Sequence, residues 1–138
     1  GSPAFAIELP DGTVVTGKGA GIMNADASAV LNAIKVLADI PKKTLLMSPA
    51  VLEPVIDLKT NLLCSSSSAL KLDDALTALY ICAAGDETAA LAVAQLPKLR
   101  GCELHSTQIL HSGDESILRK LRMNFTCEPV FPDKSLMI

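Results

Sequence analysis

A glycine-rich segment near the N-terminus is the first place where residue types suggest chemistry. Residues 12–18, Gly-Thr-Val-Val-Thr-Gly-Lys, match the first part of the phosphate-binding pattern GxxxxGK. Gly19 stands where that pattern needs a Ser or Thr hydroxyl for magnesium, and residues 13–16 have the β-branched character of a strand, so a complete P-loop is not expected. Loop amides ahead of a helix can still receive an anion. Lys18 and Gly19 are therefore candidate ligand-binding residues, although a plain connector explains them as well.

A second group of chemically active residues surrounds His105. Side chains alternate along a strand, so Glu103, His105 and Thr107 are expected on one side of a strand predicted over 102–110. An acid, an imidazole and a hydroxyl on one face can transfer a proton, and they can equally form a polar network. His105 is a candidate catalytic residue and Thr107 a candidate ligand-binding residue, whereas His111 is expected to face solvent.

Two predicted helix openings carry further polar residues. They read Asn24-Ala25-Asp26 and Ser48-Pro49-Ala50-Val51-Leu52-Glu53. Asn, Asp and Ser are favoured at the N-cap of a helix, and Pro is favoured at its first position, so capping explains these residues. As the functional alternative, Asp26 is a candidate catalytic acid and Ser48 a candidate ligand-binding residue.

Periodicity and turn chemistry predict the elements that must position these residues. Pro10-Asp11-Gly12 separates two strand-like runs, 5–9 and 13–16, which predicts a hairpin. A helix ending at Ile40, a short buried strand over 44–47 and a helix from Pro49 to Leu62 follow. Helices over 73–84 and 86–96, the strand over 102–110, a helix over 112–121 and a strand over 126–130 complete the chain. This order predicts an α/β fold in which helices cover a mixed sheet.

The same order of elements resembles the cytidine-deaminase-like fold, a three-layer αβα sandwich with a mixed sheet. In that family one helix opens with H-x-E and the next with P-C-x-x-C, and these residues hold a catalytic zinc ion. Here Asn24 and Ala50 stand at ligand positions, Asp26 replaces the Glu, and Glu53 replaces the second thiolate. The resemblance therefore implies a cytidine-deaminase-like frame that lacks the zinc ligands, and neither a metal nor a cofactor is expected.

Composition narrows the class of protein. Of the 138 residues, 49% are hydrophobic and 20% are charged, and the mean hydropathy is +0.38. These values indicate one soluble domain, residues 3–138, after a Gly1-Ser2 that looks like a cloning scar. The apolar runs are too short to span a membrane. A net charge of −3 and 3% aromatic residues argue against nucleic-acid binding.

The cysteine pattern bears on the compartment. Cys64, Cys82, Cys102 and Cys127 form no CxxC pair, so a zinc ribbon or a thioredoxin-like motif is not expected. Reduced thiols in a cytoplasmic protein are the leading interpretation, and two disulfides are the alternative.

A closer resemblance covers nearly the whole chain. It rests on Leu9-Pro10-Asp11-Gly12, Thr16-Gly17-Lys18, Leu31-Asn32-Ala33, Ser48-Pro49, Glu53-Pro54 and, as its most specific piece, residues 95–107. These segments resemble the C-terminal part of the uncharacterised family called domain of unknown function 1846. The resemblance implies the C-terminal subdomain of a longer cytoplasmic protein and brings no established activity. The zinc-protease label given to some members has no support here, because the sequence has no HExxH.

Two functional hypotheses follow. The first is a non-zinc α/β domain that binds a ligand or packs against the N-terminal part of its own longer chain and against a second copy. The second is part of a zinc-independent enzyme acting on a small nucleotide-like or anionic substrate. Convergence of Lys18, Asp26, Ser48 and His105 on one pocket would favour the enzyme, and their dispersal would disfavour it.

Overall fold

The N-terminal hairpin forms where the turn chemistry predicts it. In the computed structural model, which describes residues 4–18, 22–65, 69–107, 109–110 and 112–127, strand β1 (Ala4–Glu8) pairs antiparallel with β2 (Val14–Lys18). The Asp11 carboxylate accepts the Thr13 amide at 2.9 Å. Gly12 has a φ of +89°, a conformation that glycine adopts without steric strain.

The first layer is a mixed sheet, as predicted, and its strand order is β2-β1-β3-β4. Strand β3 (Glu103–Ser106) pairs antiparallel with β1, and β4 (Asn124–Cys127) pairs parallel with β3. Ile7 and Leu104 are paired neighbours, and both are fully buried. Along β2 and β3, buried residues alternate with residues that are more exposed. One face of the sheet is therefore packed and the other is exposed.

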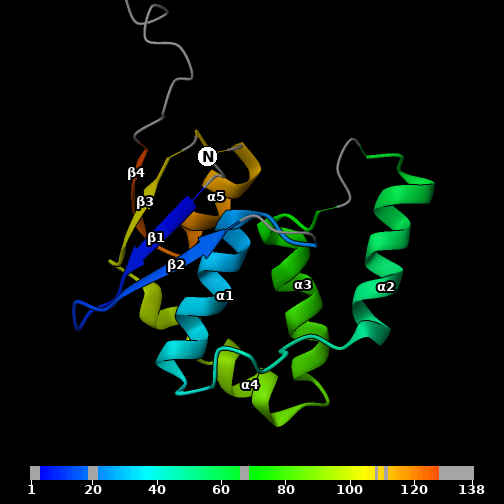
Figure 1. Cartoon of the computed structure of the whole chain (residues 1–138), viewed down its shortest axis with the longest axis horizontal. Helices are drawn as coiled ribbons and strands as arrows, with labels where there is room; N and C mark the ends of the chain where they lie inside the picture. Colours follow the sequence, from blue (N-terminus) through cyan, green and yellow to red (C-terminus); the bar gives the residue numbers. More distant parts are fainter. Residues whose placement is uncertain (1–3, 19–21, 66–68, 108, 111, 128–138) are drawn as a thin grey trace, which may run out of the picture.

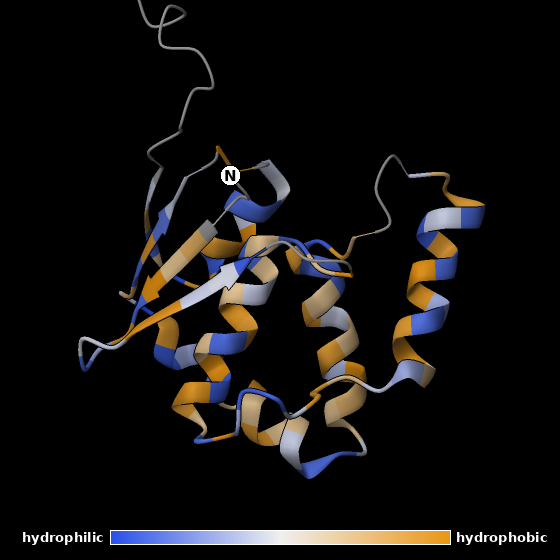
Figure 2. Ribbon diagram, viewed as in Figure 1, coloured by the Kyte–Doolittle hydropathy of each residue, from blue (hydrophilic) through white to orange (hydrophobic). Residues whose placement is uncertain are grey.

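Helices form the second layer on the packed face (Figure 1). Helix α1 (Ala25–Leu37) lies against β2 and β1, and α3 (Leu72–Ala83) contacts α1, α4 (Glu87–Val93) and α5 (Ser112–Lys120). Helix α2 (Pro49–Asp57) continues as a π-helical turn, η1 (Leu58–Leu62), and packs on the far side of α3. A 3-10 turn, η2 (Leu96–Leu99), leads to β3. Figure 2 shows apolar residues along β1 and along the helices behind it.

Three expectations need correction. Residues 44–47 form no strand: Leu46 and Met47 plug the core from a loop, and β3 occupies the place beside β1. The predicted strand over 102–110 ends at Ser106, and the last strand starts at Asn124 rather than 126; residues 128–130 lie outside the described part. The three-layer expectation is not met by the described residues, because no helix among them covers the outer face of the sheet.

The sheet and the helical layer approach each other closely at Gly17. A Cβ atom built there would lie 2.6 Å from Ala29 Cα and 2.7 Å from the Ala25 carbonyl oxygen, and closer still to the Ala29 nitrogen. Real Cβ atoms do not approach backbone atoms this closely. The glycine that completes the phosphate-binding pattern thus has a packing role: it lets the backbone of α1 rest directly on β2.

Replacing Gly17 by Ala (G17A) should therefore push α1 away from β2. We expect a loss of about 1–3 kcal/mol or more in the free energy of unfolding, the range for overpacked cores, measured by urea denaturation. Gly85→Ala is the matched control, because nothing lies within 4 Å of its added Cβ. Equal stability of G17A and the wild type would contradict the close packing.

Candidate functional site

The predicted site residues on the sheet lie on its exposed face or edge. Lys18 ends β2 and is exposed, and His105 is exposed where β3 pairs with Ala6. Glu103 is on the same face, but its carboxylate accepts a bond from Asn124 on β4 at 3.4 Å. Thr107 follows β3 and is exposed. Gly19 and His111 lie outside the described residues.

Ser48 and Asp26 lie apart. Ser48 is the exposed N-cap of α2, with Pro49 at the first helical position as predicted, and its side chain makes no capping bond. Asn24 is likewise the N-cap of α1 without a side-chain capping bond. The first turns of α1 and α2 lie at opposite ends of the helical layer (Figure 1). The structure therefore does not bring Lys18, Asp26, Ser48 and His105 into one pocket.

Asp26 is the predicted residue with the most unusual surroundings. It is only 2% exposed in the first turn of α1, and Asp114, 3% exposed, reaches it from the first turn of α5. Asp26 Oδ1 accepts the Ala27 amide at 2.8 Å, and Asp114 Oδ1 accepts the Leu72 amide of α3 at 3.4 Å. The first turns of α1, α3 and α5 thus meet at two buried carboxyl groups.

Burial, followed by the hydrogen bond and the charge of the neighbouring Asp114 carboxyl, together raise the pKa of Asp26 to about 7. Two buried carboxylates in contact cannot both ionise at neutral pH without strong repulsion. Asp26 Oδ2 is buried and has no hydrogen-bond partner among the described atoms. A proton on this oxygen can be donated to the neighbouring Asp114 carboxyl, which favours the protonated form of Asp26 up to about pH 7.

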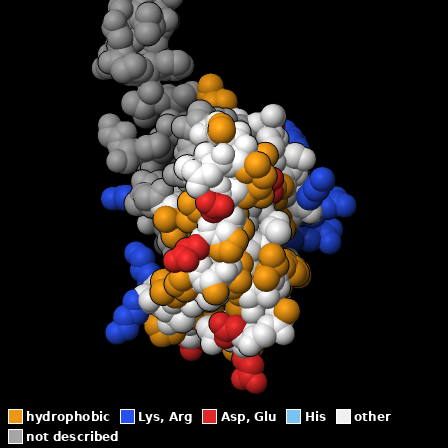
Figure 3. Space-filling model, turned by 90° about the vertical axis from the view of Figure 1, so that its right-hand side faces the viewer, with side chains coloured by type: hydrophobic (Ala, Val, Ile, Leu, Met, Phe, Trp, Pro, Cys, Tyr) orange, Lys and Arg blue, Asp and Glu red, His pale blue; other side chains and the backbone are white. Residues whose placement is uncertain are grey.

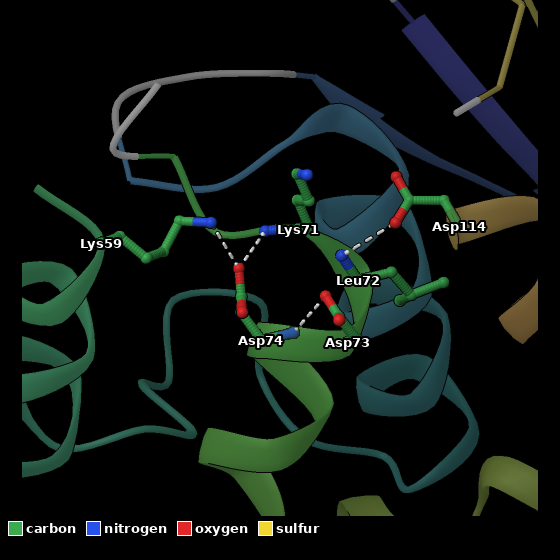
Figure 4. Close-up of polar contacts among 6 residues, drawn as sticks. All are labelled: Lys59, Lys71, Leu72, Asp73, Asp74 and Asp114. Atoms are coloured by element: carbon green, nitrogen blue, oxygen red, sulfur yellow. Dashed lines mark hydrogen bonds and ion pairs between the residues drawn. The ribbon is translucent and has the colours of Figure 1, made fainter. Parts of the chain in front are cut away.

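Neighbouring helix starts are occupied by carboxylates too (Figure 4). At α3, Asp73 Oδ1 accepts the Asp74 amide at 2.8 Å, and Asp74 Oδ2 accepts both the Lys71 amide at 3.1 Å and the Lys59 ammonium at 2.7 Å. The amides that would attract an external anion at a helix N-terminus already have internal acceptors. At this end of the helical layer, internal carboxylates therefore occupy helix-start amides that a small anion would need.

Sequence reasoning missed Asp114 as a partner of Asp26. Its only signal was the Ser112-Gly-Asp-Glu115 capping-box spacing, which predicts the start of α5 and says nothing about distant partners. The contact joins residues 88 positions apart in the chain only because the first turns of α1 and α5 lie next to each other.

Cationic side chains gather on the outer side of α5. A shallow groove of about 580 Å³ is lined by Ser112, Glu115, Ser116, Arg119, Lys120 and Arg122. Arg119 bonds Glu115 at 2.8 Å and lies 5.0 Å over the Phe125 ring. Lys120 and Arg122 supply the remaining positive charge of the groove.

The described residues contain neither a cluster suited to a metal ion nor a helix suited to a bilayer. Within them, no cluster of three or more His, Cys, Asp or Glu side chains is placed to hold a metal ion. Cys64, Cys82 and Cys102 are free thiols. No helix in the described ranges has the length and apolar character needed to cross a bilayer.

Comparison with known sequences gives a family but no activity. The family described as "Domain of unknown function DUF1846, C-terminal" matches residues 1–137. A UPF0371 protein of Clostridioides difficile (strain 630) is 48% identical over 134 residues, which are 97% of this chain and 27% of that protein. A UPF0371 protein of Clostridium tetani (strain Massachusetts / E88) is 46% identical over the same shares. The chain thus spans about a quarter of the length of these relatives.

The carboxyl pair generates a prediction about pH. Asp26 keeps its proton to about pH 7 in the folded chain but loses it near 3.8 when unfolded, so the folded state binds more protons between these values. The free energy of unfolding therefore falls as pH rises through that window, by about 2–4 kcal/mol from this group. Asp26→Asn cannot ionise, and its amide can donate to Asp114, so D26N should lose this decline.

Chemical denaturation of both proteins from pH 4 to pH 8 measures the effect. Asp73→Asn, which alters an exposed carboxylate at a helix start, is the control and should follow the wild type. Parallel curves for D26N and the wild type would show that Asp26 ionises normally in the folded chain.

Proposed function

Because the chain belongs to the DUF1846 family as its C-terminal domain, we propose that it is an interdomain module that packs against the N-terminal part of a longer protein. The family match and the length of the relatives support the longer chain. Nearly three-quarters of the Clostridioides difficile relative lies outside the matched region. The partner in this proposal is the preceding part of the same polypeptide, and the location is the cytoplasm.

The observation that carries the proposal is the surface of α2 and η1. Helix α2 has the sequence PAVLEPVID, yet none of its residues is buried. The following turn exposes Leu58, Leu62 and Leu63, the latter two at 74% and 61%. Figure 3 looks onto this side of the molecule and shows apolar side chains spread over it, with a few acidic ones between. We call the exposed apolar side of residues 49–63 the α2 surface.

Charge on the α2 surface indicates what it would contact. Lys59 is 8% exposed and turns inward to Asp74, while Glu53 and Asp57 remain exposed. The surface is therefore apolar with a negative bias. Contiguous apolar patches are rare on free-standing soluble proteins and mark interaction sites, so the surface fits an apolar partner face that carries some basic side chains.

Dispersal of the candidate catalytic residues supports a binding module over a self-contained enzyme. His105 and Lys18 are on the exposed side of the sheet, Asp26 is inside, and Ser48 is at the opposite end of the helices.

A second candidate function, the binding of a small anionic ligand, is favoured by the groove beside α5 that Arg119, Lys120 and Arg122 line. A second copy of the chain is the competing occupant of the α2 surface.

A cytidine-deaminase-like frame is part of the proposal. The hairpin leads into α1, and β1 lies inside a mixed sheet, antiparallel to both neighbours; both features support it. The outer face of the sheet is uncovered in the described part of the chain, so the third layer of such a frame would come from residues outside that part.

Hydrogen exchange of residues 49–63 tests the proposal. We expect their amides to exchange at least about tenfold more slowly in the full-length protein than in this chain alone, because a covered surface opens less often. Leu62→Glu in the full-length protein should abolish the slowing, since it places a charge in an apolar contact.

Val14→Glu is the matched control, because Val14 is 60% exposed on β2, away from α2. It should leave the slowing at residues 49–63 unchanged. Identical exchange in the two forms of the protein would refute the α2 surface as the interdomain contact, and slowing that grows with the concentration of this chain alone would assign it to a second copy.

A further inference from the structure

Strand β2 leaves one side without a strand neighbour in the described sheet, where it pairs only with β1. The Thr16 carbonyl oxygen accepts a bond from Asn32 Nδ2 at 3.0 Å, so the backbone of Thr16 points away from β1. Backbone groups in a strand alternate in direction, which gives Val14 and Lys18 the same outward orientation. An edge of this kind is a template for pairing with a further strand.

A groove runs beside this edge. It has a volume of about 230 Å³ and lies between residues 13–16 on the strand side and Asn32, Lys35 and Val36 of α1, with Lys42 at its end. Val36 is 48% exposed and Val14 is 60% exposed. An edge strand flanked by an apolar groove is the geometry in which sheets receive extended peptides: the backbone pairs along the edge, and alternate side chains enter the groove.

The positive charge of Lys35 and Lys42 in the groove favours an acidic ligand. Lys35 Nζ donates to the Lys42 carbonyl oxygen at 2.9 Å, and both side chains line the groove, whose described lining contains no Asp or Glu. Burial lowers the pKa of Lys35, and the Lys42 charge lowers it further. Both effects disfavour the charged ammonium, and a nearby carboxylate would reverse them. The groove lacks an anion and would gain one from an acidic peptide.

We propose that the groove between β2 and α1 binds an extended acidic segment of another polypeptide, which pairs with the edge of β2 and sets a carboxylate against Lys35 and Lys42. The N–H groups of Val14 and Thr16 and the Val14 carbonyl oxygen supply the pairing, because the Thr16 carbonyl oxygen already accepts a bond from Asn32. Val36 receives a small apolar side chain, and the two lysines fix the register of the acid. This surface is on the sheet edge and does not include the α2 surface, so it stands independently of the interdomain proposal.

Selection from a phage-displayed random peptide library against this chain, as it stands, is the first test. The enriched peptides should share an Asp or Glu at one position within a run of β-branched residues. Binding of the best peptide, titrated into the 15N-labelled chain, should shift the amides of Val14 and Thr16. A library that yields no binder, binders without an acid, or shifts confined to α2 would overturn the proposal.

Variants complete the test. Lys35→Glu should weaken the selected peptide by about tenfold or more because it replaces an attraction by a repulsion, whereas Lys43→Glu, outside the groove lining, should not. Thr16→Pro removes an outward N–H, which an edge strand tolerates, and should abolish binding. If circular dichroism shows that T16P is unfolded, Val36→Asp replaces it. Unchanged affinity in K35E, or a dimer of the chain that competes with the peptide, would overturn the proposal.

Discussion

The direct contact of α1 with β2 at Gly17 is the constraint on which the rest of the structure depends. Because a side chain at this position would overlap the backbone of Ala29, helix and strand approach until main chain touches main chain. Ala25, Ala29 and Ala33 keep the helix side equally small, and all three are buried. This contact fixes the distance of α1 from the sheet and the orientation of its axis. The first turn of α1 consequently lies in the interior beside α3 and α5.

The buried carboxyl pair is a consequence of that placement. Asp26 would be an ordinary exposed first-turn acid on a helix that sat further from the sheet, but here it meets Asp114 with water excluded. Favourable helix-dipole interactions and amide bonds from Ala27 and Leu72 hold each carboxyl group in place. Their mutual repulsion is relieved by one retained proton.

Local signals in the sequence were sufficient for the hairpin and the helices. Pro10-Asp11-Gly12 specifies the turn, and apolar periodicity with Ser48-Pro49 and Asp86 places the helices within a few residues. The pattern of residues 44–47 could not distinguish a strand from a loop, because a short apolar run suits both; in the structure Leu46 and Met47 are buried and Leu45 is exposed. The sequence pattern does indicate which face of the sheet is exposed, because Glu8, Thr16 and His105 alternate with apolar neighbours. The Asp26–Asp114 contact was not, because it depends on how separate helices come together.

The Lys59 side chain points inward and joins the end of α2 and η1 to α3 through its ion pair with Asp74. The wide π-helical turn, in which the Leu63 amide bonds the Leu58 carbonyl oxygen at 2.9 Å, brings the Lys59 ammonium to Asp74. This ion pair and a set of half-buried side chains are what hold residues 49–63 to the domain. Segments with little buried area open at a small fraction of the global free energy. We therefore expect local opening of residues 49–63 to require less free energy than unfolding of the sheet and α1.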